Sequence, residues 1–222
     1  MNLKILKSIN LYKTLYYNFK FLPFSEALKL PIAVGYNTTI YNMQNVRVVG
    51  GGRFAFSFGL PINSFIDKRE SSIFDFRGKT TIYGRCVFGS GSKLIIDKDG
   101  EMEIGEGFVC TGGCNIECHR KITFGKNCVL SWNITMLDTD FHPIYDGEGK
   151  HLNPNKPITI GDKVWIGCRS TVLKGVTIAD NVVVASNSTI SKNITKPNTV
   201  VCNDSSEIKY IKDNIKWEPT YI

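Results

Sequence analysis

The residues with the clearest chemical potential lie at positions 138–143, where two aspartates precede a histidine and a proline. A neutral imidazole such as that of His142 can take a proton from a hydroxyl and later give it to a leaving group. Such a base needs its other ring nitrogen oriented, and Asp138 and Asp140 are near enough in sequence to do so or to contact a substrate. We favour Asp140 for the orienting role. Taken alone, a histidine beside proline is more often an ordinary loop residue, and the aspartates can equally form Asx turns.

These residues need a scaffold, and the strongest signal for one is a period of six. Every sixth residue from position 160 is a branched aliphatic: Ile160, Ile166, Val172, Ile178, Val184 and Ile190. The fifth residues of the same hexads are small or β-branched: Val164, Ser170, Val176, Val182, Ser188 and Ile194. Neither the spacing of a helix nor the alternation of a simple strand explains this pattern. It predicts one short strand and one corner per hexad, three hexads per triangular coil, and inward-facing first and fifth positions.

The same pattern recurs upstream in shifted frames. The recurring first positions are Phe76, Ile82, Phe88 and Leu94, then Ile104, Cys110 and Ile116, then Phe124, Leu130 and Met136. The frame changes at 94→104, 116→124 and 136→160, which predicts insertions at corners. The last insertion is long and contains several prolines and glycines, so we expect a protruding irregular loop over 138–157.

The two ends of the chain differ from its middle, which suggests three regions. Residues 1–45 predict a helical and extended cap, with a helix over 1–30 that Pro23 interrupts and Pro31 ends. Residues 46–200 predict the repeat domain, and the Gly- and Phe-rich stretch 31–75 supplies its leading strands. Residues 201–222 predict a capping segment with a short helix around 204–216.

Composition and charge bound the class of protein. The 222 residues carry 27 Lys+Arg and 20 Asp+Glu, a net charge of +7, and are 42% hydrophobic, which is typical of a folded chain. No apolar run reaches the roughly 18 residues of a membrane span. Lys4, Lys7 and Lys13 interrupt the apolar N-terminus, so we expect no secretory signal. Seven cysteines, an odd number, favour a reducing compartment. We therefore expect a cytoplasmic protein, or one peripheral to the inner face of the membrane.

The basic excess is concentrated in residues 1–40, which hold five lysines against Glu26. No nucleic-acid-binding motif accompanies these lysines, so we expect no nucleic-acid partner. Two interpretations remain: a solvated terminal helix, or weak attraction of the lysines and the apolar residues among them to an anionic membrane surface. The apolar residues form no clean stripe in the sequence, which favours the solvated helix.

A run of cysteines, Cys110, Cys114 and Cys118, is followed by His119 and resembles a metal site. The spacing does not match the C-x2-C pair of zinc sites. The period places Cys110 at a first position, and it assigns inward fifth positions to Cys86, Cys114 and Cys128. A free cysteine serves there as a small apolar residue. We expect Cys118 to face outward and the chain to hold no metal.

Three segments give the chain a family resemblance. They are Ile160-Gly161-Asp162-Lys163-Val164-Trp165-Ile166-Gly167, Leu173-Lys174-Gly175-Val176-Thr177-Ile178 and Asp138-Thr139-Asp140-Phe141-His142-Pro143. With them the chain resembles the hexapeptide-repeat acyltransferases, and among these the O-acetyltransferases of sugars and bacterial surface polysaccharides. The resemblance is strong over 100–200 and weaker over 76–99. It implies an all-β solenoid, a left-handed parallel β-helix of hexapeptide repeats, here with an N-terminal helical segment and a short C-terminal helix.

The resemblance also implies partners and site residues. Members of the family are usually trimers, bind acetyl-CoA between neighbouring prisms and use a loop histidine, here His142, as general base. The positions that meet acetyl-CoA in the family correspond to Trp165, Cys168, Ser186, Ser191 and Lys192. Trp165 is expected to face outward, against the pantetheine arm or only against another subunit. Lys192 either meets a phosphate or is solvated.

Two departures from the family concern the acceptor and the coenzyme. The relatives carry an acceptor-binding asparagine where this chain has Gly113, so a galactoside or maltose specificity is not carried over. Their closing Gly-x-Pro-Ala-Lys segment is replaced by residues 203–207. We assign acceptor contacts to Asp138, which lies beside the histidine, and to Gly113, which stands where the relatives carry the asparagine.

The sequence as a whole predicts an acetyl-CoA-dependent O-acetyltransferase that acts on a saccharide hydroxyl, in a polysaccharide or its precursor. Transfer is expected to be direct, with His142 as base and backbone N–H groups holding the oxyanion. The alternatives are a non-catalytic trimeric scaffold and an N-acetyltransferase of an amino sugar.

Overall fold

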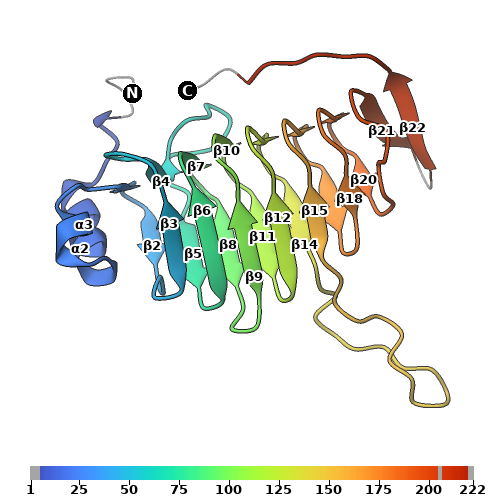
Figure 1. Cartoon of the computed structure of the whole chain (residues 1–222), viewed down its shortest axis with the longest axis horizontal. Coiled ribbons are helices and arrows are strands. Elements are labelled where there is room, and N and C mark those ends of the chain that lie inside the picture. The colour runs from blue at the N-terminus through green and yellow to red at the C-terminus, as the bar shows by residue number, and fades with distance from the viewer. Residues whose placement is uncertain (1–5, 205–206, 220–222) are drawn as a thin grey trace.

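The computed structural model describes residues 6–204 and 207–219. The strands in these residues wind into a prism whose three faces are β-sheets (Figure 1). Sheet I contains β1 (Ile32–Val34), β4 (Phe56–Leu60), β7 (Cys86–Gly89), β10 (Phe108–Cys110), β13 (Val129–Leu130), β16 (Trp165–Ile166), β19 (Val183–Val184), β21 (Val200–Asp204) and β22 (Glu207–Lys212). Sheet II contains β2 (Thr38–Ile40), β5 (Ser72–Phe76), β8 (Lys93–Ile96), β11 (Asn115–Cys118), β14 (Thr135–Leu137), β17 (Thr171–Leu173) and β20 (Thr189–Ile190). Sheet III contains β3 (Val46–Val49), β6 (Lys79–Tyr83), β9 (Glu101–Ile104), β12 (Lys121–Phe124), β15 (Ile158–Ile160) and β18 (Thr177–Ile178).

Successive hexads visit the three sheets in turn, as the period predicts. Ile166, Val172 and Ile178 lie in β16, β17 and β18, one in each sheet. Strands one coil apart pair in parallel, so that Met136 aligns with Val172. The first and fifth residues of all hexads from 160 to 194 are buried inside the prism. The prediction of inward positions is therefore confirmed.

The core changes in character along the prism. Its N-terminal half is filled by stacked phenylalanines, with Phe58 and Phe74 at 4.7 Å and Phe108 and Phe124 at 4.8 Å between ring centroids. Its C-terminal half is filled by valine and isoleucine. In the first coils, Phe74 rather than Phe76 aligns with Leu94, which corrects the predicted frame by two residues.

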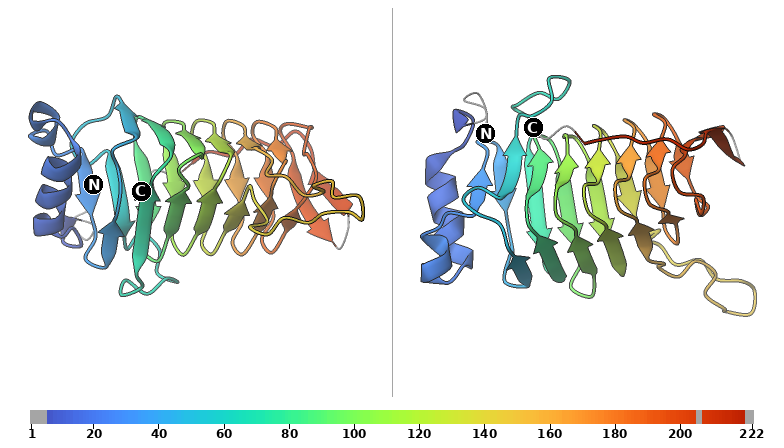
Figure 2. Two further views of the ribbon diagram at one scale, coloured as in Figure 1. Left: turned by 90° about the horizontal axis from the view of Figure 1, so that it is seen from below. Right: turned by 45° about the horizontal axis from the view of Figure 1, so that its top comes forward.

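All three predicted insertions fall at the same corner, between sheets II and III. The longest separates β14 from β15 and projects from the lower edge of the prism (Figures 1 and 2). It is less irregular than expected, because Tyr145 and His151 form an antiparallel bridge within it. We call residues 138–157 the loop.

The N-terminal boundary of the β-helix differs from the prediction. Within residues 7–204 and 207–219 the helices are α2 (Leu11–Phe21) and α3 (Phe24–Ala27), separated at Pro23. The first coil begins at Ile32 in β1, which pairs in parallel with β4, and not at residue 46. Strands of only three residues, between Gly35 and Pro31, carry too little periodic pattern to reveal this in the sequence. No helix among the described residues has the length and apolar character needed to cross a bilayer.

The C-terminal helix predicted around 204–216 is wrong. Residues 200–204 extend sheet I as β21, and β22 folds back on β21 in antiparallel pairing. Val201 is buried in the core, so this segment completes the prism as a strand, which suits β-branched residues. Positions 205 and 206 lie outside the described residues. The chain then runs back along the corner between sheets III and I (dark red in Figure 1), where Trp217 Nε1 donates to the carbonyl of Lys163 at 2.7 Å.

The cysteines behave as core residues with one exception to the prediction. Cys86, Cys110, Cys114 and Cys128 are buried as expected. Cys118 is also buried, not outward-facing, because it ends β11 two residues after the inward Ile116. Burial, together with the nearby Asp138 carboxylate, raises the pKa of the Cys118 thiol far above its ordinary range. Within residues 6–204 and 207–219, no group of three His, Cys, Asp or Glu side chains is arranged to hold a metal ion.

Candidate active site

The loop begins at Asp138, which was expected to contact a substrate or the histidine and which the structure buries. Asp138 has no exposed surface, and its oxygens accept the backbone N–H groups of His119 at 2.7 Å and of Arg120 and Lys121 at 2.8 Å. Three N–H donors on one carboxylate form a tight charge-assisted cluster. With no exposed surface, Asp138 presents nothing to a saccharide in this structure, and the acceptor contact assigned to it stays a prediction. Its role in the structure is to fix the start of the loop to the preceding coil.

His142 follows a strained turn. The backbone N–H of Phe141 donates to Thr139 Oγ1 at 3.0 Å, and that of His142 donates to the carbonyl of Asp140 at 2.7 Å. Phe141 adopts φ +62°, a left-handed conformation that non-glycine residues rarely take and that concentrates at functional sites. The returning strand of the loop holds this turn, since Asn153 Nδ2 donates to the carbonyl of His142 at 2.9 Å.

Asp140 does not orient the imidazole as predicted. Its carboxylate accepts hydrogen bonds from Lys174 Nζ and from Asn153 Nδ2. Within residues 6–204 and 207–219, no side chain hydrogen-bonds the His142 ring. Lys174 and then Asn153 hold the pKa of Asp140 below its ordinary value. Lys174 lies in one of the family-like segments of the sequence, but nothing in the sequence gave it a role. The register supplies the missing signal, because Met136 aligns with Val172 and places Lys174 beside the loop.

This contact gives a prediction that does not depend on activity. Replacing Lys174 by alanine removes the stronger of the two partners, so the pKa of Asp140 should rise toward the ordinary aspartate value of about 3.9. The contact contributes stability above that ordinary value and is lost as the pH falls through the lowered one. Side-chain carboxyl NMR shifts followed against pH measure the change. Asn153→Ala should raise the pKa less, and an unchanged pKa in Lys174→Ala would contradict the pairing.

A cavity of about 210 Å³ lies at the base of the loop, and all three histidines of the chain line it. His142 and Asp140 line it together with His119 and His151. His119 was not predicted as a site residue. Its Nε2 lies 3.0 Å from Glu117 Oε1, and its ring meets that of Phe141 edge-on at 5.5 Å. An imidazole with a carboxylate partner has the orientation that a general base needs, which makes His119 a competitor to His142.

The residues assigned to the coenzyme divide between two edges of the prism. Trp165 in β16 faces outward from sheet I, as predicted, with 40% of its surface exposed. Its Nε1 donates to Ser131 Oγ at 3.0 Å, and its ring lies 6.0 Å from that of Trp217. Cys168 and Ser186 lie at the next corner, between sheets I and II, 3.4 Å apart.

Ser191 and Lys192 lie elsewhere. They are exposed at the end of β20, on the corner between sheets II and III from which the loop also leaves. The structure therefore groups His142, Asp140, Ser191 and Lys192 along one corner of the prism. It places Trp165, Cys168 and Ser186 on another face and corner of the same chain.

Gly113 offers little surface to an acceptor. It is buried, its φ is +63°, and a Cβ there would lie 2.2 Å from Asn133 Oδ1 and 3.0 Å from Ile66 Cδ1. Ile66 belongs to the segment between β4 and β5, which folds over this corner, and Phe65 beside it stacks on Trp132 at 4.9 Å. The acceptor contact assigned to Gly113 stays a prediction, for which this packing leaves little room. The exposed Phe65 and the half-buried Trp132 occupy that corner instead.

Comparison with known proteins identifies the repeat. The family model described as bacterial transferase hexapeptide, with six repeats, matches residues 157–192. This segment of the chain therefore resembles the hexapeptide repeats of bacterial transferases. The match and the three sheets of parallel coils confirm the predicted left-handed parallel β-helix.

Two curated proteins to which the chain is similar are polysialic acid O-acetyltransferases. That of Neisseria meningitidis is 43% identical over 91 residues, which cover 40% of this chain and 39% of the relative. That of Escherichia coli O1:K1 / APEC is 35% identical over 96 residues, which cover 42% and 29%. The chain thus spans about two fifths of the first relative's length and under a third of the second's.

Solved structures that the chain matches include two sugar acetyltransferases. A polysialic acid O-acetyltransferase is 27% identical with a TM-score of 0.45, and the superposition covers 84% of this chain and 90% of the other. A galactoside acetyltransferase in complex with coenzyme A is 21% identical with a TM-score of 0.46, covering 95% and 80%.

Proposed function

We propose that this protein is an acetyl-CoA-dependent O-acetyltransferase of a saccharide hydroxyl. The observation that carries the proposal is that His142 lines a cavity at the base of a loop that a strained turn and Asn153 hold in place. The names of the two curated relatives support the reaction class and a saccharide acceptor.

The surface around Trp165 has the chemistry that acetyl-CoA requires. The exposed indole offers an apolar face to the pantetheine arm, and the exposed hydroxyl of Ser186, at the next corner, offers a hydrogen-bonding group. When bound, acetyl-CoA supplies an activated thioester. His142 accepts the proton of the acceptor hydroxyl as that oxygen bonds to the acetyl carbon, and it returns the proton to the sulfur as the C–S bond breaks. Backbone N–H groups stabilise the oxyanion between these events.

The separation of the two groups of residues supports a homotrimer. His142 lies on the corner between sheets II and III, whereas Trp165 lies in sheet I. Prisms packed side by side bring the loop corner of one copy toward a face of the next. We propose that the complete site forms in this way, and the mass of the assembly in solution tests it.

Acetyl-CoA binding is the first test, because it requires no knowledge of the acceptor. At about 100 times its Kd the ligand should stabilise the protein by about 2.7 kcal/mol, which raises the thermal midpoint by several degrees. Free CoA should also shift the midpoint, and an unrelated adenine nucleotide is the control. No shift at saturating acetyl-CoA would contradict the proposal and favour the non-catalytic scaffold. Acceptors with and without free amines then separate O- from N-acetylation.

A further inference from the structure

Helix α2 packs with its polar side inward. Thr14, Tyr17 and Asn18 are buried. Their side chains form hydrogen bonds with backbone groups at the free edge of the first coil. Asn18 Nδ2 donates to the carbonyl of Ile32 at 2.8 Å, and the N–H of Val34 donates to Thr14 Oγ1 at 3.1 Å. The helix thus closes the end of the prism by hydrogen bonds to the backbone. An amphipathic helix of a folded domain normally buries its apolar side.

The opposite side of α2 is apolar and exposed. It carries a continuous stripe at helical spacing: Leu11, Tyr12, Leu15, Tyr16 and Phe19. Phe24 and Leu28 in and after α3 add to it. Of the 19 large hydrophobic side chains exposed among the described residues, ten lie within residues 6–41, so the exposure is concentrated in this cap. A contiguous apolar surface of this kind marks an interaction site. The expectation of no clean apolar stripe is therefore wrong for Leu11 to Phe19, where the apolar residues recur at helical spacing.

The charges around the stripe are almost all positive. The sequence around it holds Lys7, Lys20 and Lys29, with Glu26 as the only acidic residue between positions 6 and 41, while Lys13 Nζ turns inward and donates to the carbonyls of Tyr36 and Thr38. Lys20 Nζ lies over the rings of Tyr16 at 5.3 Å and Phe21 at 4.9 Å. Such a lysine can cover apolar rings while its ammonium reaches outward.

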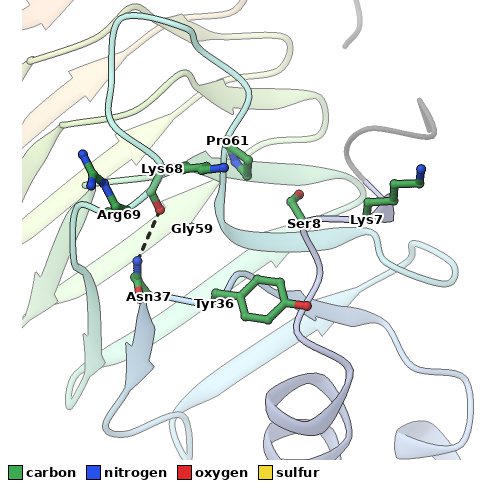
Figure 3. A pocket seen from close by; sticks show the side chains of 8 residues that line it. All are labelled: Lys7, Ser8, Tyr36, Asn37, Gly59, Pro61, Lys68 and Arg69. Atoms are coloured by element: carbon green, nitrogen blue, oxygen red, sulfur yellow. Dashed lines mark hydrogen bonds between the residues drawn. The ribbon is translucent and has the colours of Figure 1, made fainter.

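A basic hollow of about 590 Å³ adjoins the N-terminal end of α2 (Figure 3). Lys7, Lys68 and Arg69 line it together with Tyr36 and Asn37. Arg69 is already paired with Asp67 at 2.7 Å, so the two lysines supply the hollow's excess charge. A phosphate group next to an apolar surface is the ligand that this combination suits.

We propose that the α2–α3 cap docks this protein on the surface of an anionic phospholipid bilayer. Aromatic and leucine side chains on one face, flanked by lysines, are the composition of a helix that lies in the membrane interface. A second copy is a poorer occupant, because a symmetric contact would bring the lysines of the two caps together. Figures 1 and 2 show the cap at one end of the prism and the loop near the other. Docking by the cap would therefore leave the loop away from the bilayer.

The test is co-sedimentation of the full chain with phosphatidylcholine vesicles that contain or lack phosphatidylglycerol. We expect binding to the anionic vesicles that weakens as salt is raised. Tyr12→Ser with Leu15→Ser should weaken it about tenfold or more, because two interfacial side chains are lost. Tyr210→Ser with Ile211→Ser, at the other end of the molecule, is the matched control and should bind as the wild type does.

Several outcomes would overturn the proposal. These are failure of the wild type to bind anionic vesicles, undiminished binding of the cap variant, and equal loss in the control. A cap variant whose assembly mass falls while its vesicle binding persists would assign the stripe to a contact between copies. Lys20→Glu, which changes only an exposed side chain, should weaken binding at least about tenfold and provides the test if the double variant unfolds. Acetyl-CoA binding is measured on the same samples, so failure of this proposal is distinguishable from failure of the proposed function.

Discussion

Replacing His142 by alanine is expected to lower acetyl transfer by about 10²- to 10⁴-fold, the range that general-base catalysis contributes. The turn that presents His142 is held by main-chain hydrogen bonds and by Asn153, none of which uses the imidazole. The variant should therefore fold normally and keep its acetyl-CoA-induced thermal shift. Steady-state kinetics with a saccharide acceptor, together with that shift, measure both expectations.

The two other histidines of the cavity provide matched controls. His151 is exposed and pairs with Tyr145 at 5.4 Å, so His151→Ala should change the rate little. His119 is the serious competitor because Glu117 holds its ring. If His119→Ala loses transfer while His142→Ala retains it, the base is His119 and the assignment of His142 is wrong. If both variants lose transfer, Glu117→Gln distinguishes a positioning role, since it should then lower kcat with the acceptor KM unchanged.

The period of six predicts the interior of the prism well, because each inward position has the same requirement at every coil. Each inward position, such as that of Val172, is enclosed by three sheets and must be apolar. Apolar residues therefore recur every six positions in the sequence. The ends of the prism lack this redundancy. Helix α2 satisfies the edge of β1 with Asn18 and Thr14, and β21 completes sheet I with a single buried valine, Val201. Each of these end contacts occurs once, so no period in the sequence reveals it.

The site is less predictable than the core for a related reason. Counting residues locates His142 on a loop, but the partners of that loop come from other coils. Lys174 bonds Asp140, from which it is 34 residues away in the sequence, and His119 enters the cavity from the preceding coil. Only the register of the coils joins these residues. The division of the site residues between two corners likewise follows from which sheet each hexad enters.

The largest expected loss of stability is that of Asp138→Ala. The substitution removes a buried carboxylate from the N–H groups of His119, Arg120 and Lys121, and leaves these donors without their acceptor. Hydrogen bonds to a charged group contribute about 1.5–3 kcal/mol each, and water can replace part of them at the corner. We expect the free energy of unfolding to fall by about 3–5 kcal/mol in equilibrium chemical denaturation.

Two further variants decide whether the carboxylate itself is responsible. Asp138→Asn preserves the shape but turns an NH2 group toward backbone donors, so it should recover only part of the loss. Asp162→Ala is the matched control at another corner, where an exposed aspartate accepts one N–H, that of Lys126, at 2.8 Å. It should cost about 1 kcal/mol or less. Equal losses in Asp138→Ala and Asp162→Ala would contradict the account, because exposure and the number of donors would then not matter. A larger loss at Asp138 would show that the loop bearing His142 is fixed to the prism by the carboxylate with which it begins.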